Sequence, residues 1–96
     1  MPAGNEISLG EAINRFIHKN QLEKKLGEQK LLADFRELVG EYISSKAKDI
    51  FIKNDKLYIK TESSVIRQEL SFMRARLLHV INRKFGEGLI KEIVVL

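Results

Sequence analysis

The sequence predicts an α+β domain in which two helical segments, a β-hairpin, a long helix and a last strand follow one another. Three observations predict this order. Apolar residues recur at helical spacing up to residue 45, they alternate with polar ones between residues 48 and 61, and the 23 residues from 63 to 85 contain neither Gly nor Pro. Only one face of the hairpin is strongly apolar, so we expect a three-stranded sheet with helices packed on one face.

The first helical segment begins at a capping box. Ser8 and Glu11 have the Ser-x-x-Glu spacing in which each end satisfies a free backbone donor of the first turn. Five apolar residues then recur at helical spacing: Leu9, Ala12, Ile13, Phe16 and Ile17. The segment is predicted to end near Lys19, because Asn20 and Gln21 interrupt the pattern. Residues 1–7 are expected to form a flexible arm before a single domain of residues 8–96.

A second helical segment is predicted from residue 22 to about Ser45, with Gly27 as a candidate position for a bend. Gly40 lies inside it, at a cost of about 1 kcal/mol relative to Ala. A close approach between helix and sheet is the usual reason for such a glycine, and we expect one here.

Two strands, residues 48–53 and 56–61, are predicted to form a hairpin around Asn54 and Asp55, which tolerate the left-handed conformations of a two-residue turn. This turn fixes the cross-strand pairs as Lys53 with Lys56, Ile52 with Leu57, Phe51 with Tyr58, and Ile50 with Ile59. The aliphatic residues then share the core face. The opposite face carries Phe51, Tyr58, Lys53, Lys56 and Lys60.

The long helix is capped by Ser63 or Ser64 and stopped by Gly86. Its apolar stripe spans about 100° and consists of Ile66, Leu70, Met73, Leu77, Val80 and Ile81. Basic residues follow both edges of the stripe: Arg67 and Arg74 on one edge, and Arg76, His79 and Arg83 on the other, beside Phe72. A last strand is predicted within residues 89–96.

The chain carries 17 Lys or Arg against 13 Asp or Glu, a net charge of +4. A charged surface that keeps a small protein soluble explains this balance, and so does an anionic partner such as nucleic acid. The distribution favours the second explanation, because residues 46–84 hold 10 basic residues against four acidic ones.

Composition also argues against several classes. No apolar run approaches the roughly 18–20 residues of a membrane span, and the N-terminus does not resemble a signal peptide. The absence of cysteine fits a cytoplasmic protein. Two His and no Cys argue against a metal site, no cofactor is expected, and no common catalytic motif is present, so we do not expect an enzyme.

The polar face of the hairpin is the sharpest functional signal. Two aromatic rings among lysines can stack on bases while the ammonium groups contact phosphates, as in single-strand binders. Phe51 and Tyr58 could equally be a stabilising cross-strand pair or an anchor for another protein. The arginines of the helix edges suit phosphate contacts, and a solvated helix surface is the alternative. A polynucleotide site requires these cations to gather into one footprint.

Several segments together resemble the DciA-like family of bacterial proteins: Phe35-Arg-Glu-Leu-Val-Gly40, then the hairpin, then Leu57-Tyr-Ile-Lys-Thr-Glu-Ser-Ser64 and Val65-Ile-Arg-Gln-Glu-Leu70. Leu77-Leu78 and Ile81-Asn82 are similar to later helix positions of the family, and the resemblance spans residues 8 to 96. The chain has Phe35 and Ile66 where the family usually has Trp. It also lacks the Gly-x-x-Gly loop of RNA-binding KH domains, so KH-style backbone clamping is not expected.

The resemblance implies a KH-like domain that binds DNA and helps to load or stimulate the replicative helicase. Combined with the residues, it predicts a non-catalytic replication accessory factor that binds single-stranded or forked DNA. The candidate contacts are Lys53, Lys56, Lys60, Arg67, Arg74, Arg76 and Arg83 for phosphates, and Phe51 and Tyr58 for bases. The alternatives are a protein-interaction adaptor that uses the hairpin face, and an RNA-binding KH-like module.

Overall fold

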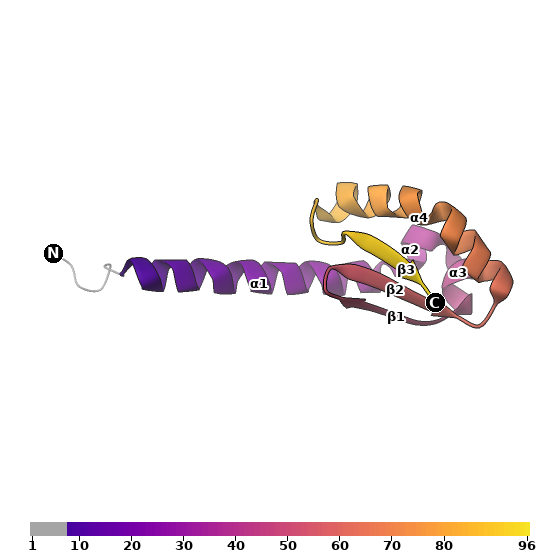
Figure 1. The fold of residues 1–96 in the computed structure, drawn as a ribbon, viewed down its shortest axis with the longest axis horizontal. Helices are drawn as coiled ribbons and strands as arrows, with labels where there is room; N and C mark the ends of the chain where they lie inside the picture. The colour runs from indigo at the N-terminus through magenta and orange to yellow at the C-terminus, as the bar shows by residue number, and fades with distance from the viewer. Residues whose placement is uncertain (1–7) are drawn as a thin grey trace.

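The computed structural model describes residues 8–96, so the predicted flexible arm, residues 1–7, lies outside the described residues. Seven elements follow in order: α1 (Leu9–Ala33), α2 (Phe35–Val39), α3 (Glu41–Lys46), β1 (Ala47–Lys53), β2 (Lys56–Thr61), α4 (Ser64–Phe85) and β3 (Glu92–Val95) (Figure 1). The predicted α+β class is confirmed, as is the order of a helical region, a hairpin, a long helix and a strand. No helix in the described range is long and apolar enough to span a bilayer.

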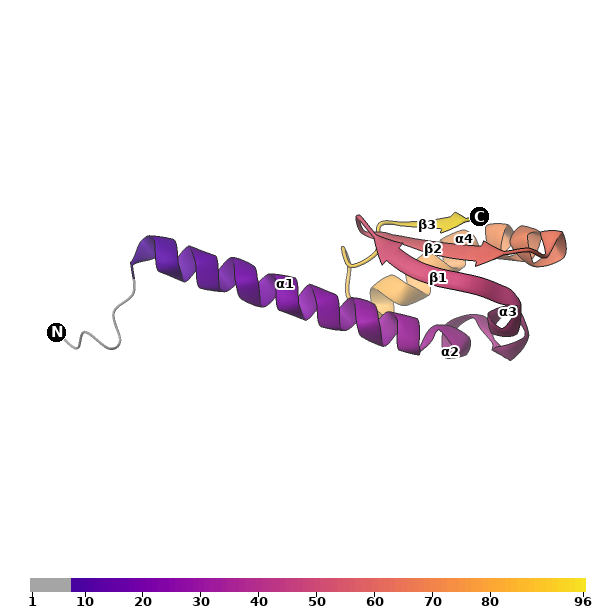
Figure 2. The same ribbon diagram turned by 90° about the horizontal axis from the view of Figure 1, so that it is seen from below.

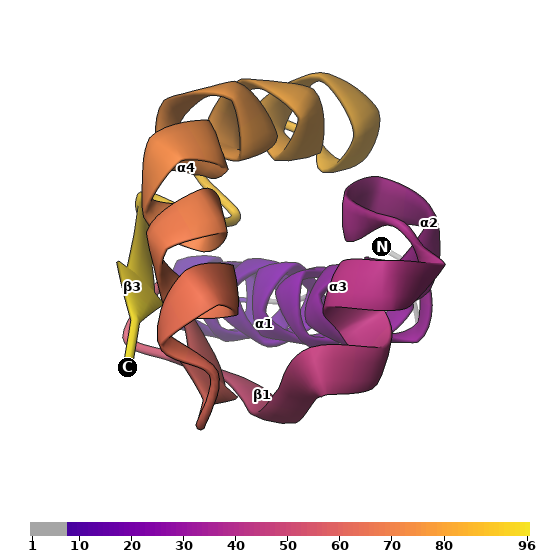
Figure 3. The same cartoon turned by 90° about the vertical axis from the view of Figure 1, so that its right-hand side faces the viewer.

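The three strands form one mixed sheet in the order β1-β2-β3, with β1 and β2 antiparallel and β2 and β3 parallel. The helices lie on one side of this sheet, and no helix of residues 8–96 lies on the other side (Figures 2 and 3). The predicted one-sided architecture is therefore confirmed. The core lies between the layers and consists of Leu31, Phe35, Val39, Leu57, Ile59, Ile66, Leu70, Leu77, Ile81, Leu89, Ile90 and Ile93.

The first helix is longer than predicted. α1 runs without interruption from Leu9 to Ala33, through Asn20, Gln21 and Gly27. Gln is a good helix former and a single Asn costs only a few tenths of a kcal/mol, so neither ends a helix whose last turns are packed. Gly27 is not a bend but a contact, since a Cβ there would lie 3.4 Å from the Leu89 side chain. At the other end, the Ser8 hydroxyl accepts a hydrogen bond from the Glu11 backbone N–H (3.1 Å), as predicted.

The predicted second helical segment is divided at Asp34 and Gly40 into the end of α1 and two short helices. Gly40 has φ +91° and ψ 159°, a combination that is essentially restricted to glycine. The expected close approach at Gly40 is wrong, because nothing lies within 4 Å of the position of a Cβ there. This glycine therefore serves the turn between α2 and α3.

The hairpin has the predicted two-residue turn, with φ of 53° at Asn54 and 64° at Asp55, and all four predicted cross-strand pairs are confirmed. The turn is also attached to its surroundings. The Asp55 carboxylate forms ion pairs with Lys24 of α1 and, at 3.8 Å, with Lys91. The Lys91 backbone N–H donates a hydrogen bond to the Asp55 carbonyl at 2.7 Å. The turn therefore connects α1, the sheet and the segment that leads into β3.

α4 begins and ends as predicted: the Ser63 hydroxyl accepts a hydrogen bond from the Ile66 N–H (3.2 Å), and Gly86 ends the helix with φ +97°. Within its predicted stripe, Val80 is 39% exposed and does not belong to the core. The last strand begins only at Glu92, because Leu89 and Ile90 are buried in the core instead of pairing with β2.

A charge-neutral substitution tests the attachment of the hairpin turn. Hydrogen bonding from Lys24, and then the charges of Lys24 and Lys91, hold the pKa of Asp55 below its ordinary value of 3.8. A carboxyl with a lowered folded-state pKa stabilises the fold above the unfolded pKa, and this stability is lost as the pH falls through the folded pKa. Asp55→Asn keeps a residue suited to positive φ.

The variant should therefore unfold at lower urea concentration than the wild type at pH 7, and the difference should shrink below about pH 4. Urea unfolding between pH 2 and pH 7 measures it. A difference that stays constant across this range would contradict the ion-pair account.

Gly40 offers a second stability test. Gly40→Ala should lower the free energy of unfolding by about 1–3 kcal/mol, because alanine is strained at this backbone conformation. Gly10→Ala is the matched control, since Gly10 lies in α1 with an open Cβ position; it should be neutral or stabilising by at most about 1 kcal/mol. Equal effects of the two substitutions in urea unfolding would contradict the conformational explanation.

Candidate nucleic-acid interface

The face of the sheet that carries no helix holds the predicted aromatic pair. Ile50, Ile52, Leu57 and Ile59 face the core, so Phe51 and Tyr58 between them point to the opposite side. Their rings are stacked, with centroids 4.8 Å apart and planes inclined by 8°. Phe51 is 36% exposed, and Tyr58 is partly exposed. Because the rings stack on each other, each covers one face of its partner, and the outer faces and edges are the parts left for contact with a base.

The predicted lysines share this face, but they differ in their partners. Lys56 forms an ion pair with Glu92 of β3 at 3.2 Å, and the hydrogen bond to Glu92 raises the pKa of Lys56. Lys53 and Lys60 form no ion pair among residues 8–96, and both are exposed. They are therefore the cations of this face that are most available to an external anion.

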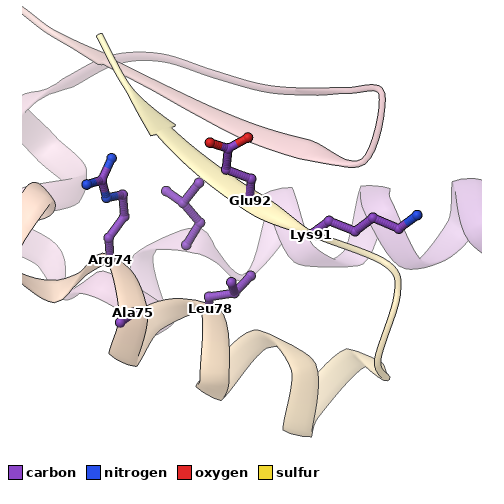
Figure 4. Close-up of a pocket in the computed structure, with 6 residues that line it drawn as sticks. Arg74, Ala75, Leu78, Lys91 and Glu92 are labelled. Carbon is purple, nitrogen blue, oxygen red and sulfur yellow. The ribbon is translucent and has the colours of Figure 1, made fainter.

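Arg67 and Arg74 lie on the edge of α4 that faces the sheet. The Arg67 guanidinium donates a hydrogen bond to the Thr61 carbonyl at 3.0 Å, at the end of β2. Arg74 lines a cavity of about 290 Å³ together with Ala75, Leu78, Lys91, Glu92 and Ile93. In Figure 4 its side chain extends from α4 beside β3. Arg67 thus stabilises the connection between β2 and α4, and Arg74 lies beside β3, the strand at the edge of the sheet.

Arg76 and Arg83 lie on the other edge of α4, away from the sheet. Arg76 lines a different cavity with Leu38, Met73, Leu77 and Val80, where α4 meets α2. At about 100° per residue, Arg83 and His79 fall on the same side of the helix as Arg76, and both are exposed. The structure therefore does not bring all seven predicted cations into one footprint. It groups three lysines and two aromatic rings on the sheet, and separates Arg76 and Arg83 from them.

Sequence reasoning missed Lys91. This residue precedes β3, lines the same cavity as Arg74 and forms an ion pair with Asp55. The prediction placed Lys91 inside a strand of residues 89–96, whereas β3 begins only at Glu92. Pairing of the last strand parallel to β2 would have placed Lys91 beside the hairpin turn, because Lys56 is opposite Glu92.

A small-molecule or metal centre is not evident in the described range. No group of three His, Asp or Glu side chains within residues 8–96 could hold a metal ion. The cavities lie on the surface and are lined by mixed polar and apolar side chains.

Comparison with known proteins agrees with the resemblance seen in the sequence. The family model described as "Dna[CI] antecedent, DciA" matches residues 8–95. Searches of curated proteins and of solved structures gave no significant match.

The hydrogen bond of Arg67 generates a stability prediction. Arg67→Ala removes a charged donor from the Thr61 carbonyl, so it should lower the free energy of unfolding by about 1–2 kcal/mol. Arg76→Ala, on the exposed opposite edge of the same helix, is the control and should change it by less than about 0.5 kcal/mol. Urea unfolding compares the two, and a larger effect of Arg76→Ala would contradict a structural role for Arg67.

Proposed function

The chain belongs to the DciA family, and we propose that it is a non-catalytic nucleic-acid-binding module that holds single-stranded or forked DNA against its open sheet face. Membership implies a role of the helicase-loader type in replication. We further propose that the domain is KH-like, acts in the cytoplasm and prefers unpaired strands. The replicative helicase is its proposed protein partner.

The observation that carries the proposal is the stacked Phe51–Tyr58 pair on a sheet face without a helix. An aromatic side chain that stacks on a base contributes about 1–3 kcal/mol, and this stacking tolerates any sequence because every base has a π-face. Bases in a duplex are already stacked and face inward, so such a platform favours unpaired strands.

Phosphate contacts would come from the cations around this platform. Lys53 and Lys60 are free of ion pairs among residues 8–96, whereas Lys56 would have to give up part of its interaction with Glu92. Arg74 and Lys91 could extend the path along β3. Arg76 and Arg83 lie on the edge of α4 away from the sheet, so we expect only longer or forked DNA to contact them.

A protein-interaction adaptor is the second candidate function, and the exposure of Phe72 favours it. Phe72 is 79% exposed on the outer side of α4, and Val65 is 64% exposed. By helical spacing, both lie on the same side as Arg76 and Arg83. Exposed apolar side chains beside arginines suit a partner with an acidic and apolar surface.

A fluorescence titration with single-stranded DNA, duplex DNA and RNA of equal length tests the main proposal. The double variant Phe51→Ser and Tyr58→Ser should bind single-stranded DNA at least about tenfold more weakly, because stacking is lost. Tyr42→Ser is the matched control, since Tyr42 is 67% exposed on α3, away from the sheet face.

Phe72→Ser should leave DNA binding unchanged and weaken binding of the helicase if the adaptor candidate holds.

Unfolding experiments on the double variant separate loss of binding from loss of fold, because the cross-strand pair stabilises the sheet by only about 0.2–1 kcal/mol. Equal loss with Tyr42→Ser, or full affinity of the double variant, would contradict the proposal. Tighter binding of RNA than of single-stranded DNA would favour the RNA-binding alternative.

Salt dependence gives an independent prediction for the lysines. Replacing both Lys53 and Lys60 by Gln should reduce the slope of log affinity against log salt concentration by about 1.4 for a single strand, because two phosphate contacts are lost. The corresponding pair Arg76→Gln and Arg83→Gln should leave the slope for a short strand unchanged. A wild-type affinity that is flat between about 50 and 200 mM salt would exclude both sets as phosphate contacts.

A further inference from the structure

The N-terminal half of α1 carries an apolar stripe that nothing in the described residues covers. Leu9 is 78% exposed, Ile13 48%, Phe16 66% and Ile17 47%. At about 100° per residue these four side chains fall within about 100° of one another. The helix extends away from the rest of the domain at this end (Figure 1). A contiguous apolar stripe on a projecting helix is typical of an interaction surface.

The stripe lies on one face of α1, and further along the helix the same face is buried against the domain. Gly27 and Leu31 fall at the same helical angles, and there they contact Leu89 and the core. The free portion ends where Asn20 and Lys24 reach the domain, since both line a cavity with residues 85–89. Residues 9–19 therefore project with an apolar face that their own domain cannot reach.

We propose that this face pairs with the same face of a second copy of the chain, with the two helices antiparallel. A two-fold axis midway between Ile13 and Phe16 places each of these residues opposite the other in the partner copy. It also sets Ala12 opposite Ile17 and Leu9 opposite Asn20. The overlap then covers residues 9–20, which fills the free portion of each helix and ends where each domain begins.

The area available supports a weak but specific dimer. The four exposed side chains present on the order of 350 Å² of apolar surface per copy, so pairing would bury about 700 Å² of apolar surface in total. Such an area belongs to the small, transient interfaces of less than about 1,200 Å². The basic side chains Arg15, His18 and Lys19 lie more than about 90° from the centre of the stripe, so the pairing does not force them together. The two sheets would lie at opposite ends of the helix pair, with both open faces exposed.

Sedimentation equilibrium without nucleic acid tests this proposal independently of the proposed function. The wild type should change from monomer to dimer within the micromolar to millimolar range, and Ile13→Glu should raise the dissociation constant at least about tenfold. Leu22→Glu is the matched control: Leu22 is 50% exposed on the same helix but lies on the opposite face. It should leave dimerisation unchanged. Circular dichroism checks that both variants keep the helix.

A spin-label distance tests the orientation, using the absence of cysteine from the chain. Labels on Lys25→Cys should be about 30 Å apart or more in the antiparallel dimer, because each lies far from the two-fold axis, whereas parallel helices would bring them within about 15 Å. The proposal is overturned by a chain that stays monomeric at millimolar concentration, which would leave the stripe to a different partner. It is also overturned by a dimer that is lost in Leu22→Glu but not in Ile13→Glu, or by the short distance.

Discussion

The two-residue turn at Asn54 and Asp55 sets the hairpin register and attaches the hairpin to α1 and to the segment before β3. Its two positive φ angles set the hairpin register, and in a sheet a shift of one residue would exchange the two faces of each strand. The observed register directs Leu57 and Ile59 into the core and leaves Phe51 and Tyr58 together on the other side. The same turn is held by Lys24 from α1 and by Lys91 before β3. The turn conformation and the position of α1 therefore stabilise each other.

Helices pack on only one face of the sheet because this register places the aliphatic side chains of the hairpin on that face. The other face carries lysines beside Phe51 and Tyr58, so it can remain in contact with water. Thr61, at the end of β2, is the buried polar residue at this boundary: its hydroxyl donates a hydrogen bond to the Lys46 carbonyl at 2.8 Å and accepts one from the Ser63 N–H at 3.2 Å. It thereby connects the end of α3 to the start of α4. The domain therefore has one small core, and the Phe51–Tyr58 pair lies outside it on the opposite face of the sheet.

Features encoded by local chemistry could be predicted from the sequence. The caps at Ser8 and Ser63, the hairpin register and the stop at Gly86 all depend on residues within one turn of each other, and all are confirmed. The length of α1 could not be predicted, because packing near Leu31 overrides the weak interruption at Asn20. The role of Gly40 also could not be predicted, because its backbone angles depend on how α2 and α3 meet. The grouping of cations also depends on tertiary structure: helical spacing revealed two arginine edges but not which edge faces the sheet.

An NMR titration of the isotope-labelled chain with a short single strand would show directly whether unpaired DNA lies on the open sheet face. The largest shift changes should occur in β1 and β2, with upfield shifts of DNA base protons from stacking on Phe51 or Tyr58, and α2 and α3 should change little. Shift changes confined to the α4 edge that carries Arg76 and Arg83, with an undisturbed hairpin, would contradict this placement of the DNA.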